Sequence, residues 1–314
     1  MMDMFMQRSA SPMLIAHQAE AFDSPDWIYE LKMDGFRCLA YMGRDSVDFR
    51  NKRNMQMLCK FPELRDVYRN VSEECILDGE VVVLVDGVPD FYRLQKRTLL
   101  TDRFKIELES KRFPASFVVF DCIYKSGQEF VWEPLMERRQ VLSQLVRENA
   151  KIAVSRYVET QGRALYSAAD EKKLEGVVAK RKESIYLMGR RTKDWVKFKR
   201  MADEEFIAAG YIKKGAHTFS LVLAKYQEDR LVYQGHVTSV VKAADISELS
   251  AVKKPPFQML PAGNGDAVWV KPDRVCVVEY MPNTQNALRQ PVFKGYRDDV
   301  SPADVQIENK FLQG

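Results

Sequence analysis

Cysteine and histidine are scarce in this sequence. The 314 residues include five cysteines and three histidines, and no two cysteines form a C-x-x-C pair. An odd number of cysteines without paired spacing argues against both a disulfide framework and a zinc site. His17, His217 and His236 have no partner spacing and are assigned no role. We therefore expect a protein of the reducing cytoplasm.

Long hydrophobic runs are also absent. The apolar run at residues 81–85 is far shorter than the roughly 20 residues that span a bilayer. Residues 1–10 contain no apolar stretch long enough for the core of a secretory signal. The hydrophobic share of 46% and the charged share of 29% are ordinary for a globular protein. We expect a soluble protein without a membrane partner.

Basic charge is concentrated in the first part of the chain. The net charge is only +4, but residues 1–200 carry 35 Lys and Arg against 30 Asp and Glu, whereas residues 201–314 carry 13 against 14. Residues 180–200 alone contain nine basic and two acidic residues. Such a segment predicts a docking site for an anionic partner, such as nucleic-acid phosphates, with Tyr186 and Trp195 adding packing.

The length of the chain predicts two domains, which we place at residues 1–202 and 203–314. The first mixes strand-like runs with two helical patterns, which indicates an α+β domain. The strand-like runs cover residues 27–42, 75–85, 117–124 and 177–180; one helix is expected after Trp132, with Pro134 in its first turn, and the other at residues 164–174. The second shows short strands separated by turn signals, which predict a small β-barrel. The acidic stretch at residues 203–205 is the expected hinge.

A lysine stands at the end of one strand-like run, in the pattern K-x-D-G formed by residues 32–35. Alternation along the run puts Trp27, Tyr29 and Leu31 on one face and Glu30 and Lys32 on the other. Lys32 is therefore expected to face a polar cleft. The tetrapeptide alone is common, and it also fits an ordinary surface turn.

Four further patterns follow residues 32–35 in order. They are Asp78-Gly79-Glu80, Phe120-Asp121, Glu175-Gly176-Val177-Val178-Ala179-Lys180 and Trp195-Val196-Lys197-Phe198-Lys199. The series resembles the nucleotidyltransferase motifs of the covalent ligase and messenger-RNA capping superfamily. Residues 12–14, 25–27, 32–37 and 288–299 are more narrowly similar to the ATP-dependent ligase domain of bacterial end-joining DNA ligases. The resemblance spans nearly the whole chain.

The resemblance implies a fold and a reaction. The fold is α+β, a nucleotidyltransferase (ATP-grasp-like adenylation) domain followed by an OB-fold β-barrel. The reaction is the ATP-dependent sealing of nicks with a 3′-hydroxyl and a 5′-phosphate in duplex DNA, in repair or end joining. Lys32 attacks the α-phosphorus of ATP, pyrophosphate leaves, AMP passes to the 5′-phosphate, and the 3′-hydroxyl then displaces AMP. The amine must first lose its proton, and nearby charge from Lys197 and Lys199 favours that loss.

Further roles are implied at matched positions. Lys199 and Arg297 join Lys32 as catalytic residues, with Arg297 orienting the leaving pyrophosphate. The nucleotide contacts expected besides Lys32 are Glu30 at the adenine amino group, Phe120 stacked on the base, Arg37 and Arg50 at the ribose or a 5′-phosphate, and Glu80, Glu175, Lys197 and Lys199 around the ribose and phosphates. Glu80 and Glu175 are also the expected ligands of Mg²⁺, with Mn²⁺ as the alternative. The expected DNA-binding residues are Arg37, Arg50, Lys180, Arg181, Lys182, Arg190, Arg191 and Lys193.

The last motif departs from the family pattern. The family usually reads R-x-D-K, but the fourth position here is Val300, so self-adenylation is expected to be slower or differently arranged. Because the first motif lies close to the N-terminus, we expect no separate N-terminal DNA-binding domain. The implied partners are nicked duplex DNA and a Ku-like end-binding protein, and the protein is expected to be a monomer.

Two alternatives remain open. A GTP-dependent capping enzyme or an RNA ligase shares Lys32 and the carboxylates and lysines around it, but it differs in nucleotide or acceptor. A non-catalytic DNA-end-binding module keeps the fold without turnover, and Val300 is the only residue that favours it.

Overall fold

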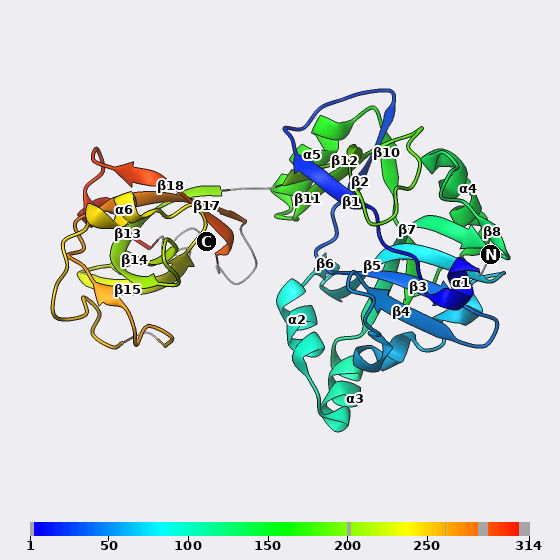
Figure 1. The fold of residues 1–314 in the computed structure, drawn as a ribbon, viewed down its shortest axis with the longest axis horizontal. Coiled ribbons are helices and arrows are strands. Elements are labelled where there is room, and N and C mark those ends of the chain that lie inside the picture. Colours follow the sequence, from blue (N-terminus) through cyan, green and yellow to red (C-terminus); the bar gives the residue numbers. More distant parts are fainter. Residues whose placement is uncertain (1–2, 200–201, 261, 282–287, 308–314) are drawn as a thin grey trace. The chain divides into compact units, whose positions relative to one another are not determined.

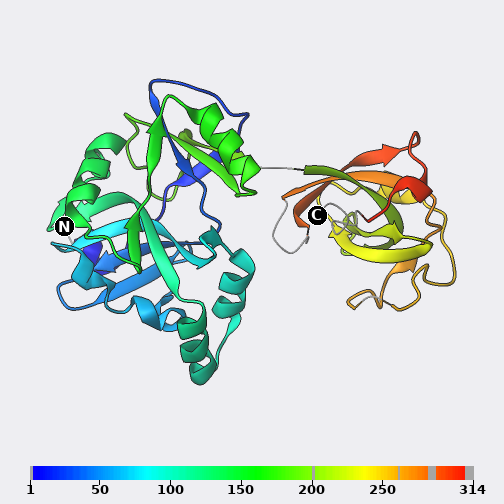
Figure 2. The ribbon, with the colours of Figure 1, turned by 180° about the vertical axis from the view of Figure 1, so that it is seen from behind.

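The computed structural model of the chain describes residues 3–199, 202–260, 262–281 and 288–307. The chain divides into two compact units, Met1–Lys199 and Arg200–Gly314, each with its own sheets and buried core (Figures 1 and 2). None of the helices within the described ranges combines the length and the apolar character that crossing a bilayer requires.

The first unit contains two sheets, and the first of them has five strands. Their spatial order is β1 (Leu14–Gln18), β12 (Arg191–Lys199), β11 (Gly176–Arg181), β2 (Trp27–Leu31) and β10 (Tyr157–Glu159). β1 and β12 run parallel, and the other neighbours run antiparallel. β2 and β12 both pair with β11, so the motif residues of these three strands lie side by side.

The second sheet of this unit has seven strands. Its main order is β4 (Val47–Asn51), β3 (Phe36–Met42), β5 (Cys75–Val85), β7 (Ala115–Lys125) and β8 (Gln128–Glu129), with β6 (Val88–Pro89) beside β5 and β9 (Ile152–Val154) parallel to β7. β5 and β7 are buried along most of their length. Their nearly continuous apolar sequences fit strands that are covered on both faces.

The strand-like run predicted at residues 27–42 is two strands in two different sheets. β2 belongs to the first sheet and β3 to the second, and residues 32–35 connect them. A side chain at Gly35 would place its Cβ 2.4 Å from the backbone oxygen of Val81, so only glycine fits this crossing. Lys32 therefore stands where the chain passes from one sheet to the other.

The two sheets pack face to face around a shared core. This core joins Ile28 and Trp195 from the first sheet to Leu39, Tyr41 and Ile76 from the second. α5 (Gly162–Glu171) packs on the other face of the first sheet. The other face of the second sheet packs against α2 (Phe91–Leu99) and α4 (Leu135–Leu145).

The structure confirms the two predicted helices as α4, which begins directly after Pro134, and α5. The described part of the first unit also contains three helices that the sequence analysis missed: α1 (Met4–Gln7), α2 and α3 (Arg103–Arg112). Phe104 and Leu108 of α3 are exposed, so this helix has no apolar stripe that a periodicity argument could detect. The remaining short turns are the 3₁₀ helices η1 (Leu58–Lys60), η2 (Pro62–Leu64) and η3 (Val67–Asn70).

The second unit is a curved antiparallel sheet. Its order is β15 (Arg230–Val237), β14 (Phe219–Gln227), β13 (Ala202–Lys213), β17 (Val275–Met281) and β18 (Arg289–Arg297), with β16 (Val268–Trp269) beside β13. An isolated bridge between Ser239 and Val292 brings the chain after β15 to β18 and partly closes a barrel. α6 (Ala243–Ser247) and η4 (Pro302–Asp304) complete the described elements of this unit.

The acidic stretch expected as the hinge is part of a strand. Asp203, Glu204 and Glu205 lie in β13 and pair in register with β17. Their backbone is therefore held in the sheet of the second unit, which corrects the prediction of a hinge at these residues.

Candidate active site

Lys32 lies at the junction of the two sheets, beside the start of β11. Its backbone N–H donates to the carbonyl of Gly176, and its Nζ donates to Glu175 Oε2 at 2.8 Å. Gly176 has φ +140°, and a Cβ there would lie 2.0 Å from the carbonyl oxygen of Phe198. Glycine thus lets β11 start tightly against β12, which holds Glu175 next to the Lys32 amine.

The predicted alternation along β2 is confirmed. Trp27, Tyr29 and Leu31 pack in the cluster beneath α5, whereas Glu30 and Lys32 line a pocket on the opposite face, which Leu31 also borders. The period of two along a strand is sufficient to explain this separation.

Two further lysines stand close to Lys32. Lys199 is buried, with its Nζ 4.0 Å from Glu175 Oε1, whereas Lys197 is half-buried. Burial lowers the pKa of Lys197, and the positive charges of Lys32 and Arg191 lower it further. Val196 and Phe198 point to the opposite face, as predicted. The three lysines form a cationic group with Glu175 as its nearest carboxylate.

Glu80 supplies the second carboxylate of this region. It pairs in register with Arg37 of β3 and with Val118 of β7, and it lines the same pocket as Lys32. Burial raises the pKa of Glu80 to about 8; Lys32 and Arg37 oppose this rise, and Glu175 adds to it. The environment of Glu80 therefore favours the protonated form of its carboxyl group.

The inner end of the pocket is built around a buried carboxylate. Glu30 Oε1 accepts from Arg139 at 3.0 Å, and Glu30 Oε2 accepts from Ser155 Oγ at 2.9 Å and from Lys180 Nζ at 3.0 Å. Burial lowers the pKa of Lys180, while the charge of Glu30 opposes that effect. Arg139 and Ser155 have no place among the predicted site residues, because no motif in the sequence marks them.

Aromatic rings form one wall of the pocket. The rings of Phe120 and Trp195 meet edge to face, and Lys180 Nζ lies 4.1 Å from the centroid of Phe120. The guanidinium of Arg37 also lies over Phe120, with 5.0 Å between Cζ and the centroid. Phe120 is thus a ring flanked by cations, a suitable surface for a flat heteroaromatic ligand.

Arg37 is fixed by a buried aspartate that the sequence analysis left without a role. Its Nε and Nη2 donate to the two oxygens of Asp78 at 2.8 and 2.6 Å, and Tyr186 Oη donates to the same carboxylate at 2.5 Å. Burial opposes the charged form of Arg37, but Asp78 raises its pKa overall. Asp78 lies two residues before Glu80 on the same strand. This spacing could have predicted that the two carboxylates lie on the same face.

Some predicted residues lie elsewhere. Lys180 is 2% exposed and paired with Glu30, so it cannot reach a phosphate on the surface, and the prediction that it binds DNA is corrected. Tyr186 and Trp195 are also buried, which corrects the suggestion that they pack against an anionic partner. Arg50 does not line the pocket; it donates to Asp48 at 2.9 Å from β4.

The remaining basic residues of the segment 180–200 are mostly exposed. Arg181, Arg190, Arg191 and Lys193 are exposed, whereas Lys182 is half-buried and paired with Glu159. Arg191 is among the charges that lower the pKa of Lys197, so this surface adjoins the lysine group. Arg200 lies outside the described residues.

Arg297 belongs to the second unit. It donates to Glu205 at 2.6 Å and also pairs with Asp299. Val300 packs against Ile207, Val275 and Val305. The position that departs from the expected R-x-D-K pattern is therefore filled by an apolar side chain that contributes to the core of this unit.

The sequence matches two family models along most of its length. Residues 9–199 match the ATP dependent DNA ligase domain, and residues 214–300 match the ATP dependent DNA ligase C terminal region. The first match alone covers more than half of the chain.

Individual relatives agree with these matches. The multifunctional non-homologous end joining protein LigD of Pseudomonas aeruginosa is 32% identical over 302 residues, which cover 90% of this chain and 35% of that protein. DNA ligase C1 of Mycolicibacterium smegmatis is 30% identical over 306 residues, covering 89% of this chain and 85% of that protein. The chain thus spans about a third of the end-joining relative and most of DNA ligase C1.

A solved structure extends the likeness to the fold. Mycobacterial DNA ligase D complexed with ATP and MES has a TM-score of 0.56 and 26% identity, over 95% of this chain and 98% of that chain. This likeness confirms the predicted fold class, an α+β nucleotidyltransferase domain followed by an OB-fold.

Proposed function

The chain belongs to the ATP-dependent DNA ligase family, and we propose that it seals nicks in duplex DNA by carrying AMP on Lys32. The observation that carries this proposal is the position of the Lys32 amine. It stands between a pocket with an aromatic wall and a buried carboxylate on one side, and Lys197, Lys199 and Glu175 on the other.

ATP would enter with its base at the inner end of the pocket. Phe120 offers an apolar face for stacking, and the Glu30 carboxylate offers an acceptor for the amino group of adenine. Arg37, which also lines the pocket, is placed to contact the ribose or a phosphate. With the base at this end, the triphosphate would extend toward Lys32.

Lys32 would then act as the nucleophile. Its Nζ forms a bond to the α-phosphorus while the bond to the pyrophosphate oxygen breaks, which leaves a lysyl-AMP. Lys197 and Lys199 would offset the charge on the phosphates. Transfer of AMP to the 5′-phosphate and attack by the 3′-hydroxyl would complete the seal.

Glu80 and Glu175 are the carboxylates that fit a divalent cation. The charge of Glu175 raises the pKa of Glu80, and a bound cation would offset that repulsion. Among the described residues, no three His, Cys, Asp or Glu side chains gather into a metal site. Mg²⁺, or Mn²⁺ as the alternative, would therefore be held by these glutamates together with nucleotide oxygens. The ion would offset charge on the phosphates.

DNA would bind along the exposed basic surface of the first unit. Arg181, Arg190, Arg191 and Lys193 are exposed and would contact phosphates. Arg181 would first leave Asp194, and Lys182 would exchange Glu159 for a phosphate. Arg37 and Arg50 are proposed contacts of the 5′-phosphate, which Arg50 could make only after leaving Asp48.

We propose residues 1–202 as the adenylation domain and residues 203–314 as the OB-fold domain. Arg297 would orient the leaving pyrophosphate, after it exchanges Glu205 and Asp299 for the phosphates. We also propose that the protein acts as a monomer in the cytosol, with a Ku-like end-binding protein as its partner. The end-joining names of several relatives support the latter.

One experiment tests the function directly. The protein is incubated with Mg²⁺ and α-labelled ATP or GTP, the covalent label is quantified, and nicked DNA or nicked RNA is then added. We expect labelling from ATP and transfer of the label to nicked DNA. Labelling from GTP alone would favour a capping enzyme, sealing of RNA alone an RNA ligase, and no label from either nucleotide a non-catalytic module.

A further inference from the structure

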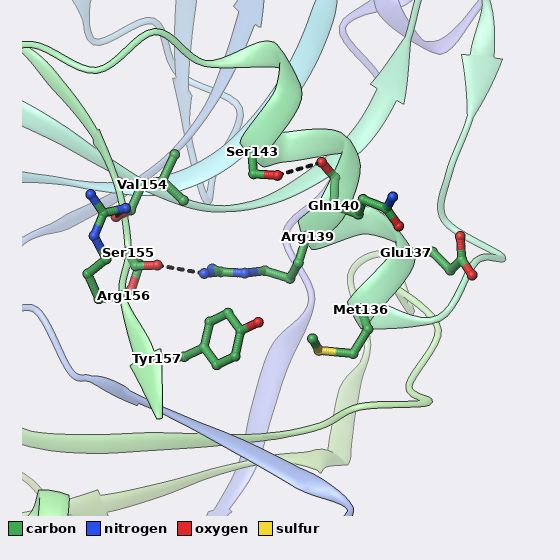
Figure 3. A pocket seen from close by; sticks show the side chains of 9 residues that line it. All are labelled: Met136, Glu137, Arg139, Gln140, Ser143, Val154, Ser155, Arg156 and Tyr157. Atoms are coloured by element: carbon green, nitrogen blue, oxygen red, sulfur yellow. Dashed lines mark hydrogen bonds between the residues drawn. The ribbon is translucent and has the colours of Figure 1, made fainter. Parts of the chain in front are cut away.

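Arg139 links the two parts of the pocket that are proposed to recognise the base. From α4, its Nη1 donates to Glu30 Oε1 at 3.0 Å and to the carbonyl of Phe120 at 3.1 Å. Its Nη2 donates to the carbonyl of Ser155. Figure 3 shows the extended side chain of Arg139 reaching Ser155, with the ring of Tyr157 alongside. One guanidinium therefore joins β2, β7 and the segment after β9.

Arg139 also forms part of a wall between two pockets. An outer pocket is lined by Arg139, Gln140, Arg156 and Tyr157, among others (Figure 3). Ser155 lines this outer pocket and also the pocket that contains Glu30 and Phe120. Arg139 is 6% exposed, and it contacts Glu30 from the side of the outer pocket. It can therefore hold the base-recognition groups without occupying the space of the base.

The purine base offers a simple chemical distinction at this position. Adenine carries an amino group at carbon 6, which donates a hydrogen bond, whereas hypoxanthine and guanine carry an oxygen that accepts one. A carboxylate in a fixed orientation accepts from the former and repels the latter. Without Arg139, Glu30 would keep Lys180 and Ser155 as partners on Oε2 alone, and Oε1 would lose its charged donor.

We propose that Arg139 is a positioning residue that sets the preference for adenine nucleotides, by fixing the Glu30 carboxylate and the Phe120 backbone together. This inference rests on the proposed use of ATP in this pocket. Arg139 itself does not touch the nucleotide. Its loss should therefore change which base is accepted more than it changes the chemistry at Lys32.

Arg138 provides a matched control. It is the neighbouring residue of α4 and fully buried, and it pairs with both oxygens of Asp121 at 2.8 and 2.9 Å. It does not line the pocket that contains Glu30. Replacing Arg138 therefore measures the general cost of losing a buried arginine from this helix.

The test compares Arg139→Met, Arg139→Lys and Arg138→Met with the wild type. Formation of the covalent label is measured with α-labelled ATP and with α-labelled inosine triphosphate, and kcat and KM are separated for each. Arg139→Met is expected to lower the preference for ATP by about 10-fold or more, mainly through a higher KM for ATP. Arg139→Lys should fall between Arg139→Met and the wild type.

Arg138→Met is expected to lower the melting temperature while it leaves the ratio of the two nucleotides near the wild-type value. An unchanged ratio in Arg139→Met would overturn the inference while the proposed function stands. If Arg139→Met does not fold, the ratio of Arg139→Lys decides in the same way. A wild-type protein that takes no label from ATP would overturn both.

Discussion

The two ends of the proposed nucleotide pocket, a proposed base end at Glu30 and a proposed phosphate end at Lys32, differ in how their charges are balanced. At the base end, the Glu30 carboxylate already has Arg139, Ser155 and Lys180 as partners. At the phosphate end, Lys32, Lys197 and Lys199 crowd around Glu175, and burial raises the pKa of Glu80 to about 8. The base end is therefore complete in the free protein, whereas the phosphate end is not.

This difference fits two separate tasks, the proposed recognition of the base at Glu30 and the proposed reaction at Lys32. A group that selects a base works best when its geometry is set before the ligand binds, because its side chain then loses little conformational entropy on binding. Groups that act on a triphosphate instead carry charges that the free protein cannot fully balance. Perturbed pKa values at the phosphate end are what such a site requires.

The largest effect is expected at the nucleophile. Lys32→Ala removes the proposed nucleophile, the pocket amine that is paired with Glu175, so we expect no detectable covalent label from ATP and no sealing that depends on ATP. Lys111→Ala, at an exposed lysine of α3, should label normally. Normal labelling of Lys32→Ala would show that another residue is the nucleophile.

A smaller loss is expected for the lysines beside it. Lys199→Met removes a buried charge near the Glu175 carboxylate, and the rate of label formation should fall by about 10²–10³-fold. Lys193→Met, at an exposed position of the same strand, should leave this rate unchanged because its side chain faces solvent. Equal rates of label formation in the two variants would show that the charge of Lys199 does not contribute to this step.

The unbalanced charge at Glu80 should appear in the pH dependence of stability. Its folded-state pKa of about 8 lies above the value of an unfolded glutamate, so folding takes up a proton between the two values. The wild type should lose stability as the pH rises from roughly 5 to 8, whereas Glu80→Gln avoids this loss. Melting temperatures without Mg²⁺ should favour the variant increasingly as the pH approaches 8. A difference in melting temperature between the wild type and Glu80→Gln that does not vary with pH would contradict the raised pKa of Glu80.

The smallest effect per substituted residue is expected on the binding of DNA by the basic surface outside the pocket. Replacing Arg190, Arg191 and Lys193 by Ala should weaken binding of nicked DNA, and the salt slope of log K should decrease by about 0.9 for each phosphate that the variant no longer neutralises. Binding titrations at several salt concentrations measure this slope. Label formation from ATP should change less than in Lys199→Met, because these exposed side chains do not line the pocket, although the charge of Arg191 acts on Lys197. An unchanged slope would exclude this surface from the DNA site.

Prediction from the sequence succeeded where the evidence was local. Alternation placed Glu30 and Lys32 on the face opposite Trp27, Tyr29 and Leu31, and it did the same for the lysines of β12. It failed for α3, in which Phe104 and Leu108 are exposed and form no buried apolar stripe. It also failed for Lys180, which resembles the other basic residues in the sequence but is buried against Glu30.

The sequence by itself determined the family, the order of the motifs and the face on which each motif residue lies, because spacing and alternation are properties of a single strand. Only the tertiary structure decided that residues 27–42 divide between two sheets and that Lys32 stands at their junction. It alone brought Arg139 to Glu30, 109 residues away along the chain. The physical reason is that a buried charge must find a partner wherever the packing of other elements places one, and no local pattern records that position.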